Sequence, residues 1–357
     1  MKEPGMNKPR GLASLADLAD FDAILDVRSP SEFAEDHIPG AISCPVLDDA
    51  QRIEIGTLYK QASPFVAKKR GAAYVSANIA RHLLEKFQDQ DKPWRPLVMC
   101  WRGGQRSGAM TTVLRAIGWD ACQLEGGYKG FRKQVLADLE TLPRKHHFRV
   151  ISGPTGSGKT RILQAIGAQG GQILDLETLA CHKGSILGRV PGDTQPSQKS
   201  FETAIWHQLN TFDPRQPVFV EAESRKIGQL RLPASLYDAM QGSSFLRVEV
   251  PLAARIDFLL GDYDYFVHQP AELAERLDFL RPLRGNATVE AWLKLLHSGQ
   301  FATLTESLLI KHYDILYGSS LARDLEGSLR APTPISVPCL DPQHLAQAAQ
   351  QMLALSE

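Results

Sequence analysis

One cysteine of this chain is placed where protein cysteines become nucleophiles. Residues 97–100 are an apolar run that predicts a buried strand, and this strand ends on Cys100. A glycine-bearing loop follows, and a helical pattern begins near Ser107 on its far side. Loop N–H groups and the positive end of a helix dipole stabilise a thiolate or a bound anion. We therefore predict that Cys100 is the catalytic nucleophile and that Arg106 assists it. The predicted anion cradle around the cysteine consists of Trp101, Arg102, Gly103, Gly104 and Gln105.

The other four cysteines are expected to be structural. Cys44, Cys122 and Cys339 lie in apolar, strand-like runs and are expected to be buried small hydrophobes, as is Cys181. The wide spacing of the cysteines excludes a disulfide framework and shows no metal-ligand pattern, which indicates a reducing compartment.

A second stretch carries the residue types that bind phosphate. Residues 153–160 match the P-loop pattern at every fixed position, between a predicted strand at 148–151 and a predicted helix at 161–166. Loop N–H groups bind phosphate oxygens, Lys159 neutralises them, and Thr160 can hold Mg²⁺, although no metal site is certain. The predicted phosphate-binding residues are Gly153, Pro154, Thr155, Gly156, Ser157, Gly158, Lys159 and Thr160.

Two further features are expected near this loop. Glu221 ends a predicted strand at 217–221, where an acid can serve the metal side of a phosphate site or form an ion pair with Arg225. The polar segment 182–199 is a candidate lid, whose basic residues bind phosphate or RNA or are solvated surface. These basic residues are Lys183, Arg189 and Lys199.

A helical region, 253–316, interleaves basic and aromatic residues, with breaks expected near Pro270, Pro282 and Gly299. Such a pattern docks a single-stranded RNA loop or belongs to the core, and the sequence leaves both open. The residues concerned are Arg255, Arg276, Arg281, Arg284, Lys294, Lys311, Tyr263, Tyr265, Phe266, Trp292 and Tyr313. A basic cluster, Lys68-Lys69-Arg70, is expected to be a solvated face.

The chain of 357 residues is long enough for two or three domains. Strands alternate with helices, which predicts parallel α/β sheets. We expect one domain at 1–142, a linker at 143–147, and a second domain at 148–357 that includes a helical region at 253–330 and a closing strand and helix. The formal net charge is zero, and no apolar run is long enough to span a membrane, so we expect a cytoplasmic protein.

The first half resembles the rhodanese superfamily in its motifs Asp26-Val27-Arg28, Glu32-Phe33 and His37-Ile38-Pro39-Gly40-Ala41. A rhodanese-like domain followed by a P-loop domain resembles the bacterial tRNA 2-selenouridine synthases over nearly the whole chain. The later motifs that carry the resemblance are residues 100–107, 153–160, Glu221-Ala222-Glu223-Ser224-Arg225 and His312-Tyr313-Asp314. The resemblance implies a rhodanese-like parallel-sheet domain followed by a P-loop NTPase-like α/β domain with a helical C-terminal region.

The same resemblance implies a transferase for tRNA modification. The family converts wobble 2-thiouridine to 2-selenouridine with selenophosphate, through S-geranyl-2-thiouridine made from geranyl diphosphate. The implied partners are tRNA carrying wobble 2-thiouridine and, as a candidate, selenophosphate synthetase. The P-loop would then hold a diphosphate and need not hydrolyse ATP, and the sequence leaves open whether selenium is held covalently on Cys100.

Alternatives remain at this point. The spacing of Cys100 and Arg106 is also that of rhodanese-fold cysteine phosphatases, although Met99 stands where a histidine usually precedes the cysteine. A rhodanese-type sulfurtransferase with a nucleotide-binding regulatory domain fits as well. A nucleotide-dependent regulatory or RNA-binding protein would carry an inert rhodanese module, which the intact Cys100 argues against.

Overall fold

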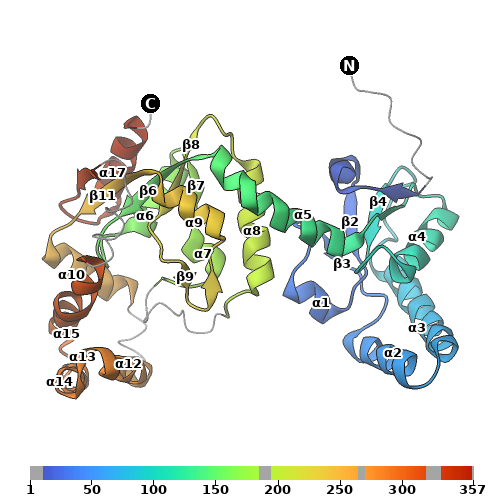
Figure 1. The fold of residues 1–357 in the computed structure, drawn as a ribbon, viewed down its shortest axis with the longest axis horizontal. Coiled ribbons are helices and arrows are strands. Elements are labelled where there is room, and N and C mark those ends of the chain that lie inside the picture. The colour runs from blue at the N-terminus through green and yellow to red at the C-terminus, as the bar shows by residue number, and fades with distance from the viewer. Residues whose placement is uncertain (1–10, 185–193, 264–269, 319–330, 356–357) are drawn as a thin grey trace. The chain divides into compact units, whose positions relative to one another are not determined.

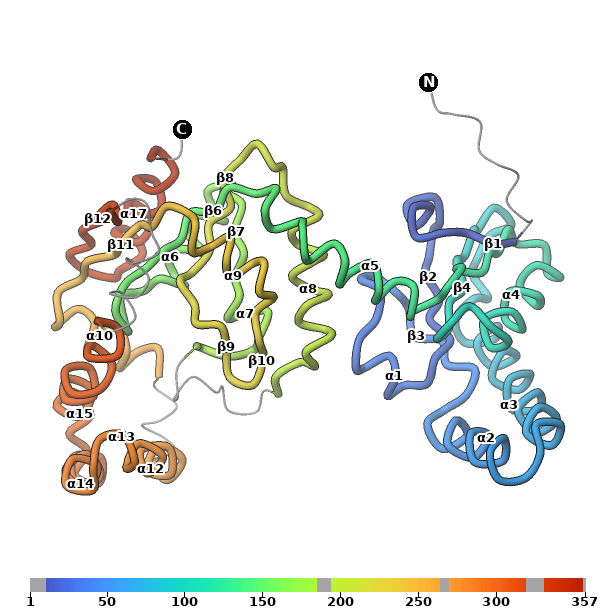
Figure 2. The backbone as a smooth tube through the Cα atoms, in the orientation of Figure 1, coloured from blue at the N-terminus to red at the C-terminus, as the bar shows by residue number. Residues whose placement is uncertain are grey.

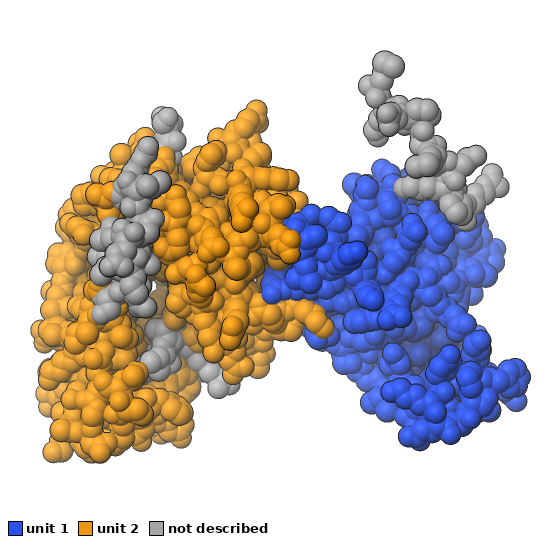
Figure 3. All heavy atoms as spheres, viewed as in Figure 1, with its two compact units in different colours: residues 1–138, 202–204 blue, residues 139–201, 205–357 orange. Residues whose placement is uncertain are grey.

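The computed structural model describes residues 11–184, 194–263, 270–318 and 331–355. The chain divides into two compact units, one formed by 1–138 with 202–204 and the other by 139–201 with 205–357 (Figure 3). Each unit is built on a five-stranded parallel sheet with helices around it, so the predicted fold class is confirmed (Figure 1). No helix in the described ranges is long and apolar enough to cross a bilayer.

The sheet of the first unit has the strand order β1-β5-β4-β2-β3. Its strands are β1 (Leu12–Ala13), β2 (Ala23–Asp26), β3 (Ile42–Ser43), β4 (Pro96–Met99) and β5 (Cys122–Leu124). Its helices are η1 (Leu15–Asp20), α1 (Pro30–Glu35), α2 (Asp49–Gln61), α3 (Pro64–Glu85), α4 (Gln105–Ile117) and α5 (Gly127–Thr141). Every residue of the central strand β4 is buried, because helices cover both faces of a parallel sheet.

The motif Asp26-Val27-Arg28 forms a buried ion pair beside the end of β2. Arg28 is 1% exposed and donates hydrogen bonds to both carboxylate oxygens of Asp26 and, at 2.6 Å, to the carbonyl oxygen of Asp36. The ring of Tyr128 packs on the guanidinium group, 3.9 Å from its centroid. The motif therefore ties β2, α1 and α5 together in the core, and its role is structural.

The sheet of the second unit has the order β12-β11-β6-β8-β7, which Figure 2 allows the eye to follow. Its strands are β6 (His147–Ser152), β7 (Gln172–Leu174), β8 (Pro217–Glu221), β11 (Ser244–Glu249) and β12 (Thr333–Ser336), with a separate antiparallel pair β9 (Lys226–Ile227) and β10 (Leu230–Arg231). The helices are η2 (Leu142–Lys145), α6 (Lys159–Ala168), α7 (Leu176–Ala180), α8 (Gln198–Thr211), α9 (Ala234–Gln241) and α17 (Pro342–Ala354). Residues 143–147, expected as a linker, form most of η2 and the start of β6.

The helical region follows β11. Its helices are α10 (Leu252–Asp262), α12 (Pro270–Asp278), α13 (Arg281–Arg284), α14 (Asn286–His297) and α15 (Phe301–Leu308), followed by the π-helical turn η3 (Leu309–Tyr313). A cluster around Leu277, Trp292 and Leu304 forms a small core of its own. Residues 319–330 of the predicted helical region lie outside the described residues.

The strand β7 is shorter than its sequence pattern indicates. Residues 174–177 alternate apolar and acidic side chains, which is typical of a strand, but β7 ends at Leu174. The side chain of Asp175 accepts a hydrogen bond from the backbone N–H of Thr178 at 2.9 Å and so begins α7. Glu177 consequently lies on a short helix.

The buried ion pair generates a stability prediction. Asp26→Ala leaves the Arg28 charge buried without its partner, which should lower the free energy of unfolding by about 3–5 kcal/mol. Urea unfolding of the full chain, followed by hydrogen exchange at β2 and β4, measures the change. Asp89→Ala, at an exposed position, is the matched control and should change it by less than about 0.5 kcal/mol. A variant at Asp26 as stable as the control would contradict the structural role of the motif.

Candidate functional site

Cys100 lies directly after β4, at the carboxyl edge of the sheet. The residue is 3% exposed. Its Sγ accepts hydrogen bonds from the backbone N–H of Gly104, at 3.2 Å, and from the hydroxyl of Ser107, at 3.1 Å. Ser107 stands in the first turn of α4, so the thiol faces the positive end of that helix. The structure therefore brings together the cysteine, the glycine loop and the helix start that the sequence pattern predicted.

The surroundings of Cys100 favour its thiolate form. Burial alone would raise the pKa of this thiol, but the Ser107 hydroxyl and the backbone N–H groups of Ser107, Gly104 and Arg102 outweigh burial and lower it. Cys44 is also buried, and burial raises its pKa to about 11, since no hydrogen-bond donor among the described residues offsets it. The hydrogen-bond donors, not burial, therefore distinguish Cys100 from Cys44 and make it the candidate nucleophile.

Neighbouring segments hold the cysteine loop in shape. The backbone N–H groups of Tyr128 and Lys129 donate to the carbonyl oxygens of Cys100 and Trp101, both at 2.9 Å. Gly103 has φ +65°, and a Cβ atom there would lie 2.6 Å from the Leu124 carbonyl oxygen. These two carbonyl oxygens of the loop thus bind N–H groups of α5. The N–H groups of the loop itself can then point towards the sulfur.

Arg106 occupies the expected position but is engaged by an acid. Its guanidinium group donates to Glu32 at 2.7 and 3.3 Å, and Glu32 also lies 3.9 Å from Arg52. Burial would raise the pKa of Glu32, but Arg106 and its other partners lower it, so the pair is ionised. Of the predicted cradle, Gly104 and Arg102 contact the sulfur through their backbones, whereas the Trp101 ring packs against Tyr128.

The predicted phosphate loop connects β6 to α6. Gly156 and Gly158 have φ +80° and +71°, and a Cβ atom at either position would press against the side chains of Leu259 and Leu340. The ammonium group of Lys159 donates to the carbonyl oxygen of Gly153 at 3.1 Å and so lies over the loop. This loop presents N–H groups, a cation and a helix N-terminus to an anion.

Three carboxylates lie at the end of this loop that carries the Thr160 hydroxyl. Thr160 donates to Glu177 at 3.1 Å, and carboxylate oxygens of Glu177, Glu221 and Glu223 lie within 4.8 Å of one another. Burial, and then the neighbouring Glu177 charge, raise the pKa of Glu221 well above its usual range and that of Glu223 to about 8. Sequence analysis identified Glu221 but missed Glu177 and Glu223, although Glu223 follows Glu221 by two residues in a motif already noted.

The carboxylates fit a divalent cation. Within the described ranges, the buried Oε1 atom of Glu221 has no hydrogen-bond partner, and such an orphaned oxygen is costly unless something binds it. Carboxylate and hydroxyl oxygens are the ligands that Mg²⁺ prefers. Thr160, Glu177, Glu221 and Glu223 would hold this ion beside a bound phosphate.

A cavity of about 1070 Å³ opens over the phosphate loop. Its polar lining comes from the loop, the three carboxylates, His182 and Lys183. Its apolar wall consists of Met240, Phe258, Leu259, Tyr263, Tyr313, Leu316 and Tyr317. Of the predicted lid, residues 185–193 lie outside the described residues, and Lys183 donates to the Asp262 carboxylate at 2.7 Å. The cavity thus suits a ligand with an anionic head and an apolar tail.

The RNA-docking hypothesis for the helical region is wrong for several of its residues. Arg255 is 5% exposed, pairs with Asp314 at 2.6 and 3.1 Å, and donates to the Thr155 carbonyl oxygen at 2.9 Å. Arg276 and Trp292 are also buried, and Tyr265 and Phe266 lie outside the described residues. Arg255 is instead a positioning residue that ties the phosphate loop to the start of the helical run 314–318. A pattern of alternating arginines and aromatics could not distinguish a buried ion pair from a surface.

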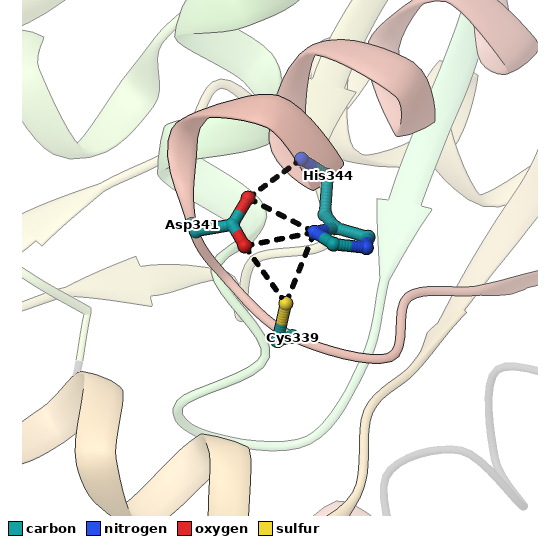
Figure 4. Close-up of side chains that lie close together, drawn as sticks. All are labelled: Cys339, Asp341 and His344. Carbon is teal, nitrogen blue, oxygen red and sulfur yellow. Dashed lines mark hydrogen bonds and ion pairs between the residues drawn. The ribbon is translucent and has the colours of Figure 1, made fainter.

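Cys339, Asp341 and His344 form a second cluster at the start of α17 (Figure 4). Sequence analysis expected Cys339 to be buried in a strand, but it follows β12 and is partly exposed. Asp341 caps α17 by accepting the His344 N–H at 2.9 Å, and it also accepts from the Cys339 thiol at 3.0 Å. The Nδ1 atom of His344 faces both of the other side chains, so the ring cannot relay a proton between them. Helix capping accounts for this cluster.

Comparison with known proteins matches both halves of the chain. A family model described as "Rhodanese-like domain" matches residues 11–134, and one described as "tRNA 2-selenouridine synthase AAA domain" matches 146–281. A tRNA 2-selenouridine synthase of Nitrosomonas europaea is 37% identical over 247 residues, which is 67% of this chain and 63% of that protein. One of Salmonella enteritidis is 34% identical over 283 residues, which is 78% of this chain and 74% of that protein. Among solved structures, an N-terminal domain from Clostridium difficile 630 covers 35% of this chain and 98% of its own length, at 32% identity and a TM-score of 0.31. The match spans slightly less than two thirds of the Nitrosomonas relative.

The hydrogen bonds to Cys100 predict its reactivity. Ser107→Ala removes the side-chain donor that lowers the pKa of Cys100 most, so the midpoint of its alkylation against pH should move upwards and the rate at neutral pH should fall. Iodoacetamide labelling, with each cysteine read separately by mass spectrometry, measures both. Ser76→Ala, at an exposed position on α3, is the control. Equal midpoints in the two variants would show that the hydroxyl does not stabilise the thiolate.

The phosphate loop and carboxylates predict cooperative binding of pyrophosphate and Mg²⁺. Lys159→Ala should weaken pyrophosphate binding about tenfold or more, because a charge-assisted hydrogen bond contributes roughly 1.5–3 kcal/mol. Glu177→Gln should abolish most of the gain in affinity that added Mg²⁺ gives. Calorimetric titration measures both, with Lys145→Ala, an exposed residue, as control. Tight pyrophosphate binding by Lys159→Ala would place the anion elsewhere.

Proposed function

The chain belongs to the tRNA 2-selenouridine synthase family, and from this premise we propose that it replaces the sulfur of wobble 2-thiouridine in tRNA with selenium. We further propose that the reaction uses geranyl diphosphate and selenophosphate and passes through S-geranyl-2-thiouridine. One observation carries the proposal. The same chain holds a thiolate-stabilising loop at Cys100 and a phosphate loop whose cavity also has an apolar wall.

The second unit suits the geranyl transfer. The sulfur of 2-thiouridine attacks C1 of the geranyl group, the C–O bond breaks, diphosphate leaves, and the base loses its N3 proton. Residues 153–160 and Lys159 would bind the departing diphosphate, and electrostatic stabilisation of a leaving group lowers the barrier. Mg²⁺, when bound, neutralises charge on the diphosphate. The apolar wall around Phe258 and Leu316 would bind the hydrocarbon chain.

The first unit suits the selenium step. Selenium bonds to C2 of the base, the C2–S bond breaks, and geranylthiol leaves. The donors around Cys100 stabilise a negatively charged sulfur. This thiolate would attack the phosphorus of selenophosphate, so that the P–Se bond breaks and selenide leaves to attack C2, and water would then release phosphate from the cysteine. We propose that Cys100 is this nucleophile and that Arg106 supports the loop through Glu32.

A rhodanese-type sulfurtransferase is the second candidate, because the Cys100 loop alone would serve it. That function gives no role to the cavity over residues 153–160 or to its apolar wall. A cysteine phosphatase leaves the same cavity unexplained. Thiosulfate-dependent persulfide formation on Cys100, without any change in tRNA nucleosides when the protein is absent, would favour the sulfurtransferase.

The proposed order of steps predicts which nucleoside accumulates. In cells that carry only a Lys159→Ala protein, wobble 2-thiouridine should accumulate, because geranyl transfer fails. In cells that carry only a Cys100→Ala protein, S-geranyl-2-thiouridine should accumulate, because only the selenium step fails. Mass analysis of tRNA nucleosides distinguishes them, with Cys122→Ala as the control that retains selenouridine, since this half-buried cysteine does not line the cavity. Normal selenouridine in the Cys100→Ala strain would refute the role of this cysteine.

A further inference from the structure

The helical hairpin α2–α3 of the first unit has a charge pattern that no proposed step uses. Between residues 55 and 84 the chain has no aspartate or glutamate. The same stretch contains Lys60, Lys68, Lys69, Arg70 and Arg81. The protein as a whole has 40 basic and 40 acidic residues, so this hairpin is a local basic element on a neutral chain.

The two helices pack side by side as a fixed element (Figure 1). Glu54 on α2 accepts hydrogen bonds from Arg70 at 3.1 Å and from Tyr74 at 2.8 Å on α3. Nearer the sheet, Asn78 donates to Gln51 at 2.9 Å. Glu54, the last acid before the stretch, is therefore paired within the hairpin, and its charge neutralises that of Arg70.

The turn of the hairpin exposes aromatic and cationic groups together. Tyr59 is 56% exposed and Phe65 is 73% exposed, so neither contributes much to a core. Lys60, Lys68 and Lys69 are exposed, and within the described residues no ion pair engages them. Apolar rings beside unpaired cations mark an interaction surface rather than an ordinary solvated face.

We propose that this turn, defined by Tyr59, Lys60, Phe65, Lys68 and Lys69, is a tRNA-binding surface that holds the substrate beside Cys100. The inference rests on the proposed function, which makes a tRNA the substrate. The cations complement the phosphate backbone, and aromatic rings stack on unpaired bases such as those of an anticodon loop. A polyanion with exposed bases uses both kinds of group.

The root of the hairpin lies next to the reactive loop. Arg52, in the first turn of α2, is 3.9 Å from Glu32, which binds Arg106 in the first turn of α4 at 2.7 Å. Seven residues separate Arg52 from Tyr59, so the exposed turn is about 10 Å further along the helix axis. A nucleotide that reaches Cys100 would therefore bring its neighbours within reach of this surface.

Binding of a wobble-2-thiouridine tRNA to the full chain tests the inference. A triple Lys→Gln variant at positions 60, 68 and 69 should bind about tenfold more weakly near 0.1 M salt, and the slope of log affinity against log salt should fall by about 2–3. Fluorescence anisotropy at several salt concentrations measures both. The matched control changes Lys92, Lys133 and Lys145, which are also exposed, to glutamine and removes the same charge.

The aromatic residues give an independent measurement. Tyr59→Ser together with Phe65→Ser should weaken binding about fivefold or more, because stacking on bases is lost. The salt slope should stay at the wild-type value, since no phosphate contact is removed. Both residues are exposed, so thermal unfolding should be unchanged.

The outcomes separate the inference from the proposed function. If the wild-type chain fails to bind this tRNA at low salt, the proposed function falls as well. If the wild type binds and the triple variant and its control share one affinity and one slope, this surface is not the docking site. Loss of binding to phosphatidylserine vesicles by the triple variant, with tRNA binding unchanged, would assign the surface to a membrane and overturn the inference.

Discussion

Both loops depend on the same constraint, which is that a central parallel strand must end at the carboxyl edge of its sheet. β4 and β6 are central strands with neighbours on both sides, so the chain beyond each can only turn outwards and return as a helix. That turn leaves the first N–H groups of the helix without intrahelical partners. In the first unit these groups face the sulfur of Cys100, and in the second they form the P-loop. One backbone arrangement thus produces a thiolate site and a phosphate site.

The loops keep their N–H groups inward only because distant segments bind their other atoms. Gln123 donates to the Gly104 carbonyl oxygen and to the Ser107 hydroxyl, so the side chain that stabilises the thiolate is itself oriented. In the second unit, Arg255 holds the Thr155 carbonyl oxygen while Asp314 holds Arg255. Loop geometry at either site is therefore set by side chains far away in sequence.

This dependence explains how much of the molecule could be predicted from sequence. The strands around 97–100 and 148–151 and the glycine loops after them were predictable because their signals are local: an apolar run, a glycine pattern and helical periodicity. Glu177 and Glu223 could not be predicted as metal ligands. Their carboxylates come close together only in the folded sheet, where the segments after β7 and β8 lie side by side. The role of Arg255 could not be decided from sequence for a related reason, since its partner Asp314 is 59 residues away. Whether a charged residue can be buried depends on such a partner, and the local sequence does not show which distant residue that partner is.

The net charge of the whole chain is also a poor guide to its binding partners. Equal numbers of acids and bases give a net charge of zero, which by itself predicts no polyanion as a partner. The structure separates these charges: three acids converge on the phosphate loop, where they fit a cation, while the α2–α3 hairpin has none over 55–84. Screening limits the field of exposed charges to about 10 Å in 0.1 M salt. A ligand therefore responds to the charges near its own binding surface, and acids at the phosphate loop do not cancel lysines at the hairpin merely because the two sets are equal in number.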